Sequence, residues 1–198
     1  TGPKKTIHEP GCYVLRRLSD NAELLPQFRD ACCTQDVVQS IRTFLQTTPE
    51  VIRHACGALE NMALDDTMKR EIFEVDGIGT ILSALEEYPD RRDIQNRGYA
   101  ALRCLFSLSQ DPLLASRTVL TFLSTLRKHM AHEDVIRRAI QAMEELTKDN
   151  VNRELIANSD VPEAMRQVLF QLPNNLDLYS RCASLLKTLE TPQETTQE

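Results

Sequence analysis

The sequence predicts an all-α protein built from a repeated helical unit, and three observations lead to that prediction. An amphipathic segment recurs along the 198-residue chain, with a leucine or methionine at residues 15, 59, 102, 143 and 186. These positions are 44, 43, 41 and 43 residues apart, a spacing typical of solenoids with two or three helices per unit. Apolar residues recur at helical spacing and aromatic residues make up only 5% of the chain, which argues against a propeller of four-stranded blades.

The repeated segment predicts the longest helix of each unit. Complete copies cover residues 52–62, 95–105, 136–146 and 179–189, and a shorter copy covers 11–18. Two shorter helical patterns lie between copies, at 68–73 and 76–85 and again at 152–156 and 160–169. Gly77 and Pro162 stand where the second of these helices should begin. Pro49, Pro89 and Pro173 separate that helix from the next long one, so each unit should contain a short, a medium and a long helix.

This pattern predicts one domain over residues 1–190. It should begin with a long helix that lacks its two partners, at 7–18, followed by units at about 20–63, 64–108, 109–147 and 149–190. The first helix of the third unit, after Asp111 and Pro112, is degenerate. Residues 191–198 form a polar tail without an apolar residue to anchor it, and we expect this tail to fray.

The order of these motifs resembles the armadillo repeat. Residues 77–82 read Gly-Ile-x-x-Ile-Leu, and residues 51–63 read Val-x-x-x-Ala-x-x-Ala-Leu-x-Asn-Met-Ala. The resemblance covers nearly the whole chain. It implies a right-handed α-solenoid of three-helix armadillo repeats, in which the third helices line a concave groove that binds extended peptides. The unpartnered helix at 7–18 hints at repeats upstream of it.

The long helices can be compared when each is numbered from one shared position. We number Asn61 and its equivalents in the other copies as zero, so that residues before it have negative numbers, and two sides of the helix then separate. Positions −10, −2 and +1 are apolar and positions −6 and −3 are mainly small, so this arc should be core. Positions −7, −4 and 0 lie on the opposite side, which the resemblance assigns to the groove. The partner-binding residues expected there, with the cations beside them, are Arg17, Arg53, His54, Asn61, Arg97, Arg137, Arg138, Gln141 and Arg181.

Position −7 holds a histidine or an arginine in four successive copies, although the chain carries a net charge of −6. Because neighbouring helices pack about 10 Å apart, these side chains should form a ladder. Two interpretations stay open. The arginines can be solvated or paired with carboxylates of the adjacent unit, for little energy. Alternatively, their guanidinium groups can bind carboxylates or phosphates of an acidic or phosphorylated protein segment.

Within the armadillo family, the groove residues distinguish two kinds of partner. Importin-alpha-like members repeat an asparagine at position 0 and a tryptophan at position −4. This chain has only Asn61 at position 0 and no tryptophan. A basic groove resembles instead that of beta-catenin, which takes acidic extended partners.

Catalytic and metal-binding motifs are absent from the sequence, and we expect no enzyme activity, cofactor or metal. His129 and His132 have the spacing of two ligands on one helix face but no third ligand, and a flexible surface pair is expected. Adjacent Cys32 and Cys33 rarely form a disulfide, and one of them should pack against the core. His8 and His54 complete the histidines, and neither belongs to a recognisable motif.

Composition limits the remaining classes of function. The net charge of −6 argues against binding nucleic acid by bulk attraction, and no apolar run could span a bilayer. The six cysteines lack zinc-site spacing, which indicates reduced thiols in the cytoplasm, with the nucleus as the alternative. We therefore expect a scaffold that binds a protein partner. One alternative is a targeting, regulatory or oligomerisation module of a larger protein such as a kinase or ubiquitin ligase, and such a module could self-associate through the ends of the solenoid. Another alternative is a chaperone cofactor.

Overall fold

The computed structural model describes the backbone of residues 4–191 and the side chains of residues 9–191. The predicted side chains of Ile7 and His8, and the tail beyond Thr191, lie outside the described residues. Within residues 4–191 the chain forms twelve α-helices, two 3₁₀ turns and no β-strand, which confirms the all-α class. The elements are α1 (Lys4–Ser19), η1 (Ala22–Leu24), α2 (Leu25–Asp30), α3 (Cys33–Phe44), α4 (Pro49–Met62), α5 (Asp66–Glu74), α6 (Gly77–Glu87), α7 (Arg92–Leu105), η2 (Phe106–Leu108), α8 (Pro112–His129), α9 (Glu133–Leu146), α10 (Asn150–Ala157), α11 (Val161–Gln171) and α12 (Leu176–Glu190).

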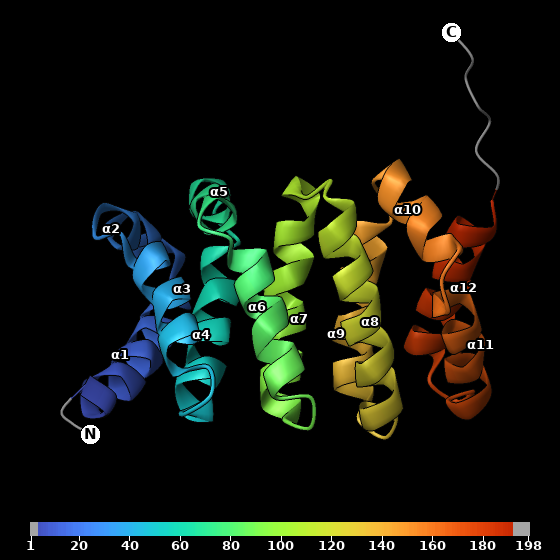
Figure 1. Ribbon diagram of the computed structural model, residues 1–198, viewed down its shortest axis with the longest axis horizontal. Helices are drawn as coiled ribbons and strands as arrows, with labels where there is room; N and C mark the ends of the chain where they lie inside the picture. The colour runs from blue at the N-terminus through green and yellow to red at the C-terminus, as the bar shows by residue number, and fades with distance from the viewer. Residues whose placement is uncertain (1–3, 192–198) are drawn as a thin grey trace, which may run out of the picture.

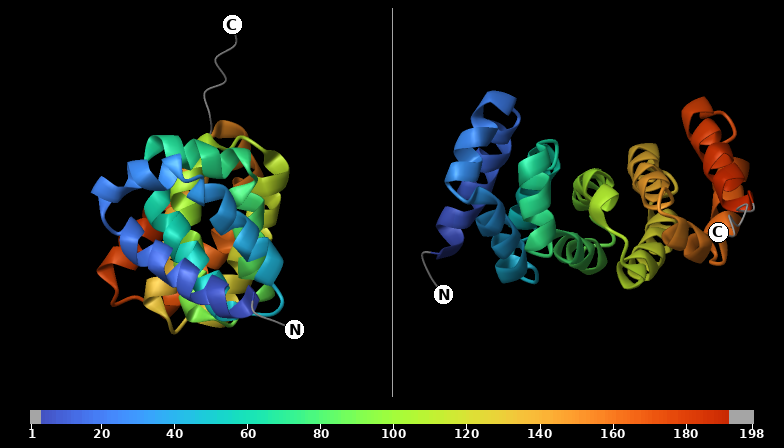
Figure 2. Two further views of the ribbon diagram at one scale, coloured as in Figure 1. Left: turned by 90° about the vertical axis from the view of Figure 1, so that its left-hand side faces the viewer. Right: turned by 90° about the horizontal axis from the view of Figure 1, so that it is seen from above.

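The helices stand side by side in a row that runs from α1 at one end to α12 at the other (Figure 1). Helices α1, α4, α7, α9 and α12 contact one another in this order, and we refer to them as the inner row. Seen from above, the row curves, with α4, α7, α9 and α12 on the inner side and α6, α8 and α11 on the outer side (Figure 2). The five segments that repeat in the sequence therefore lie next to one another in space.

The helix starts have local causes that the sequence displays. Pro49 and Pro162 occupy the first turns of α4 and α11, where the missing N–H would have no helical acceptor. Asp65 caps α5 by accepting hydrogen bonds from the N–H groups of Thr67 and Met68. Asp149 caps α10 in the same way. These caps satisfy N–H groups that have no partner within the helix, and they fix the boundaries close to where the pattern places them.

The third unit differs from the other complete units as the degenerate pattern suggests. Asp111 caps a single helix, α8, which runs for 18 residues with Pro112 in its first turn. Only the 3₁₀ turn η2 precedes it, where the second and fourth units have the short helices α5 and α10. The first and second helices of this unit are thus continuous.

The core lies between the inner row and the outer helices, and small residues allow the helices around it to pack closely. Ala55, Ala101 and Ala139 are fully buried, and Gly98 is also buried. A methyl group on Gly98 would come within 2.5 Å of Leu85 Cδ2, so this glycine permits the contact between α6 and α7. The predicted small positions therefore have the expected role, because they set how closely neighbouring helices approach.

Replacing two glycines with alanine should have opposite effects on the free energy of unfolding. Gly11→Ala, where an added Cβ meets no atom within 4 Å, should raise it by about 0.5–1 kcal/mol through reduced backbone entropy. Gly98→Ala should lower it, since overpacking costs about 1–3 kcal/mol and exceeds the backbone gain. Urea unfolding of the two variants beside the parent chain measures both values. An equal gain at both positions would show that α6 and α7 are not in tight contact.

Candidate functional site

Two predicted ladder arginines are paired with carboxylates of the preceding inner helix. Arg97 Nη1 lies 2.7 Å from Glu60 Oε2, and Arg181 Nη1 lies 2.9 Å from Glu144 Oε2. In both pairs, position −7 of one helix meets position −1 of the helix before it. The first interpretation of the ladder, pairing between adjacent units, therefore holds at these two places.

The other two junctions of the inner row cannot be neutralised in this way, because position −1 is itself an arginine. Arg16 on α1 precedes His54 on α4, and Arg103 on α7 precedes Arg138 on α9. Arg138 reaches instead to Glu60, with its Nη2 at 3.8 Å from Oε1. The Nε of Arg103 is buried and has no hydrogen-bond partner among the described residues. Positive charge is thus left over at alternate junctions.

A second series of contacts crosses the same junctions nearer the helix N-termini. Position −8 of one helix meets an aspartate in the first turn of the next. Arg53 Nε lies 3.5 Å from Asp93 Oδ2, and Arg137 Nε lies 2.6 Å from Asp177 Oδ2. Asp177 also accepts from Arg181, which places Arg137 and Arg181 beside one carboxylate. Both predicted residues of the α9–α12 junction are therefore paired.

A pocket of about 450 Å³ opens where α1, α4, α7 and α9 meet. Its lining contains four arginines but only two aspartates, a formal excess of two positive charges. This set, which we call the inner pocket, comprises Arg16, Arg53, Arg92, Asp93, Asn96, Arg97 and Asp134. The pocket therefore includes Arg53 and Arg97 from the predicted site and adds residues that were not predicted.

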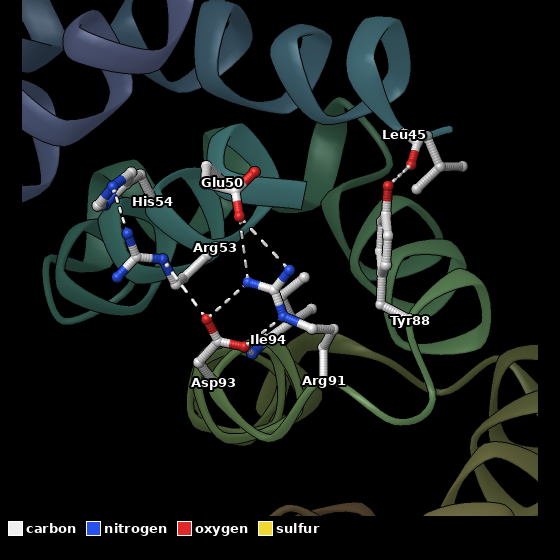
Figure 3. A network of polar contacts seen from close by, with 8 residues as sticks. All are labelled: Leu45, Glu50, Arg53, His54, Tyr88, Arg91, Asp93 and Ile94. Carbon is white, nitrogen blue, oxygen red and sulfur yellow. Dashed lines mark hydrogen bonds and ion pairs between the residues drawn. The ribbon is translucent and has the colours of Figure 1, made fainter. Parts of the chain in front are cut away.

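Asp93 is engaged by two arginines and leaves little capacity for a third. It lies between Arg53 and Arg91, whose Nη2 is 3.0 Å from Oδ2, and Arg91 also reaches Glu50 at 3.5 Å (Figure 3). Burial alone would raise the pKa of Asp93, but the hydrogen bond and charge of Arg91 outweigh burial and lower it. Asp93 therefore stays ionised and holds Arg53 at the edge of the pocket.

Asp134 is similarly committed. Arg92 Nη2 lies 2.9 Å from Oδ1, and Asn96 donates a hydrogen bond of 2.8 Å to Oδ2. Burial acts to raise the pKa of Asp134, whereas these donors, Arg92 first, lower it on balance. Both aspartates of the inner pocket are thus satisfied by groups other than Arg16.

Arg16 is the inner-pocket cation without an ion pair among the described side chains. Its stem lies directly on Gly57, where an added Cβ would be 2.7 Å from Arg16 Cδ. Burial, followed by repulsion from Arg97 and then Arg53, lowers the pKa of Arg16. A guanidinium that shares a pocket with two others and is repelled by them favours the arrival of an anion. A comparison of position −1 of each long helix with position −7 of the next would have indicated Arg16 from the sequence. Glu60 and Glu144 at position −1 neutralise the arginine of the following helix, whereas Arg16 at position −1 adds a positive charge.

Arg17 and Asn61, both expected among the partner-binding residues, lie outside the inner pocket. The side chain of Arg17 is 63% exposed, 3.9 Å from Asp20 and outside the inner pocket. The amide of Asn61 donates to Arg16 O, Ser19 Oγ and Asp20 Oδ1 at 2.8–3.2 Å. The Nδ2 of Asn61 therefore fixes the end of α1. Gln141 is half-buried on α9.

His54 was expected on the open face but is only 5% exposed. Its Nε2 contacts Arg53 Nη2 at 2.9 Å, its Nδ1 is buried without a described partner, and its ring packs edge-on against Tyr13. Burial first, and then the charges of Arg53 and Arg16, lower the pKa of His54. The prediction was wrong because α1 packs against α4 and covers this position.

The same close packing removes part of the expected groove face. Position −4 is buried at Gly57 and at Ala100, which is 1% exposed. These residues lie on helices that contact both neighbours in the inner row. The side opposite the core is therefore partly a helix–helix contact, and its accessible groups are the longer side chains that line the inner pocket.

The histidine pair and the cysteines were the remaining candidates for chemistry. His129 is 2% exposed and its Nε2 lies 2.8 Å from the carbonyl oxygen of Pro89, so the expected flexible surface pair is wrong for this residue. Its Nδ1 is 3.4 Å from that of His132. All six cysteines are free, with Cys33 half-buried and Cys32 exposed. Within the described residues, no three His, Cys, Asp or Glu side chains could hold a metal ion together, and no helix is long and apolar enough to cross a membrane.

Comparison with known proteins adds no family to this geometry. No protein-family model and no curated protein matches the chain. The resemblance to the armadillo repeat therefore remains a prediction that depends on the sequence pattern.

Removing the charge of Arg16 should not destabilise the fold, in contrast to removing that of Arg97. Arg16→Met keeps an aliphatic stem over Gly57 and removes repulsion, so the free energy of unfolding should rise by about 0.2–0.5 kcal/mol. Arg97→Met leaves Glu60, whose side chain is 15% exposed, with only the longer contact to Arg138. It should lower the free energy of unfolding by about 1 kcal/mol. Urea denaturation tests both, and a loss of stability in Arg16→Met would mean that its charge has a partner.

Acidification should destabilise the folded chain partly through His54. Because its pKa is lower in the folded than in the unfolded chain, the unfolded chain binds the proton more readily. Stability is therefore fully present above the unfolded pKa of about 6.5 and declines as the pH falls below it. The urea midpoint should drop less between about pH 7.5 and 5.5 in His54→Gln than in the parent chain. Identical drops would exclude His54 as the source.

Proposed function

We propose that this chain is a right-handed α-solenoid of armadillo-type repeats that binds an extended acidic segment of a protein partner along its inner row. The observation that carries the proposal is the inner pocket, which has two more positive than negative charges in a chain of net charge −6. We further propose that the chain is not an enzyme and acts in the cytoplasm, with the nucleus as the alternative compartment.

The spacing of the inner row supports an extended ligand. Neighbouring helices lie about 10 Å apart, and an extended strand rises about 3.3 Å per residue. Every third residue of such a segment therefore meets the next helix. Leftover charge at the α1–α4 and α7–α9 junctions would receive the acidic side chains, while backbone groups of the segment reach polar residues such as Gln141.

Ion pairs already present at the inner row do not prevent binding. The side chains of Arg97 and Arg138 are each 36% exposed, and both share Glu60. The two guanidinium groups are more exposed than Glu60, whose side chain is 15% exposed, so an incoming carboxylate can reach them while Glu60 stays paired. A ligand carboxylate would then complete the coordination of both guanidinium groups.

Self-association through α1 is a second candidate, favoured by a separate observation. Tyr13, Val14 and Leu18 on α1 are 47%, 47% and 45% exposed. Apolar residues clustered in this way are typical of a contact with another helix. A regulatory or oligomerisation module would use this surface and would not need the inner pocket.

Binding of an acidic peptide tests the leading proposal directly. The probe is a fluorescein-labelled peptide of about 15 residues, with glutamate at every third position and glycine or serine between, matching the helix spacing. We expect saturable binding by anisotropy, with a Kd that rises at least about tenfold from about 0.05 to 0.5 M NaCl as exposed charges are screened. The same peptide with glutamine should not bind.

The double variant Arg97→Glu/Arg138→Glu should abolish this binding, because it reverses charge at two adjacent helices. Arg29→Glu/Arg70→Glu is the matched control, since it makes the same change in net charge on α2 and α5, outside the inner row. Thermal unfolding by circular dichroism checks that both variants fold. Normal binding by the folded inner-row variant would refute the proposed groove.

A further inference from the structure

We propose that the inner pocket binds a phosphate monoester, carried by a phosphorylated serine or threonine of the bound segment. This inference rests on the proposed function and makes it more specific, because it names one side chain of the partner and the pocket that receives it. Three guanidinium groups from three successive inner helices, those of Arg16, Arg53 and Arg97, line the pocket.

The charge of the pocket matches a dianion better than a carboxylate. Four arginines and two aspartates leave a formal charge of +2. Including Glu60 and Arg138, which are ion-paired to its edge, does not change that difference. A phosphate monoester carries about −1.5 to −2 at neutral pH, whereas one carboxylate would leave half of the excess uncompensated.

The free hydrogen-bond donors also fit a phosphate group. The guanidinium of Arg16 has no described acceptor, so its full set of donors is available. Arg97 uses Nη1 for Glu60, which leaves its Nη2 and Nε. Arg53 uses Nη2 at His54 and directs Nε toward Asp93 at 3.5 Å, which leaves its Nη1. Phosphate offers three acceptor oxygens, and the planar donor arrangement of arginine suits such groups.

Neighbouring contacts hold these donors in place before a ligand arrives. Gly57 lets the Arg16 stem lie flat against α4, because any larger residue would meet Cδ at 2.7 Å. Asp93 restrains Arg53 and is itself held by Arg91 (Figure 3). Glu60 restrains Arg97. Side chains that are already restrained lose less entropy on binding, which favours a specific site over diffuse attraction.

The corresponding place at the α9–α12 junction lacks this property. Arg181 is bound by both Glu144 and Asp177, and Arg137 by Asp177. No arginine occupies position −1 of α9, since Glu144 stands there. The α7–α9 junction also has an arginine at position −1, but this residue, Arg103, does not line the inner pocket. Phosphate recognition should therefore occur at the inner pocket, near the α1 end of the inner row, and fix the register of the bound segment.

Three peptides that differ in one residue test the inference. They are the fluorescein-labelled acidic peptide described above with its central residue changed to phosphoserine, glutamate or serine. In anisotropy titrations the phosphoserine peptide should bind at least about tenfold more tightly than the glutamate peptide, because it makes an additional charge-assisted interaction of about 1.4 kcal/mol. The serine peptide should bind most weakly.

Arg16→Met should remove the preference for phosphoserine, so that the phosphoserine and glutamate peptides bind this variant with affinities within about threefold of each other. Arg17→Met is the matched control, since Arg17 is the next residue of α1 and lies outside the pocket. It should retain the phosphoserine preference. If Arg16→Met keeps that preference, or Arg17→Met loses it, the pocket assignment is wrong.

The remaining outcomes separate the two proposals and the two sources of phosphate. Equal affinity for phosphoserine and glutamate peptides overturns phosphate recognition and leaves the acidic scaffold standing. Failure of every peptide to bind overturns both. Inorganic phosphate and free phosphoserine, followed through the Nε–H resonances of the arginines by NMR, should bind far more weakly than the peptide. Affinity equal to that of the peptide would assign the pocket to a small free anion and overturn the peptide inference.

Discussion

Close approach of the inner helices is the constraint on which the rest of this structure depends. Gly57 admits the stem of Arg16, Gly98 admits Leu85, and alanines such as Ala55 and Ala139 are fully buried. Small residues at such contacts let helix axes come close, and the charged residues at their edges then face one another across each junction. Packing thus determines which charges meet, and only afterwards does electrostatics determine which of them are neutralised.

Much of the fold could be predicted because its causes are local. Periodicity located the inner helices, and proline or aspartate at helix starts placed boundaries such as those of α4 and α5. The continuous α8 also has a local cause, because Asp111 caps one helix where two were expected. The repeat pattern does not specify whether a side chain on a polar arc is later covered by a neighbour. For that reason the predicted open position of His54 failed when α1 packed over it.

The candidate site was predictable only in outline because ion pairing depends on residues about forty positions apart. The sequence showed cations at position −7, but the partner of Arg97 is Glu60 and that of Arg137 is Asp177. Asp93, Asp134 and Asp177 all lie in first turns, where the helix dipole favours a negative charge. Each of them therefore has two reasons to remain ionised. Assigning the groove by one face of one helix overlooked Arg16, whose importance arises from the missing carboxylate across the junction.

Because Arg16 has no ion pair among the described side chains, anion binding at the inner pocket should be linked to the free energy of unfolding. In the free chain, burial of the Arg16 guanidinium, and after it repulsion from Arg97 and Arg53, opposes folding and lowers the pKa of Arg16. A bound anion would remove this repulsion and, by mass action, raise the free energy of unfolding with ligand concentration. A solvated surface arginine would show no such linkage, because water and salt already screen it. If the inner pocket binds an anion, the ligand should therefore stabilise the fold, and this stabilisation should be lost when the charge of Arg16 is removed. A solvated polar face would show neither effect.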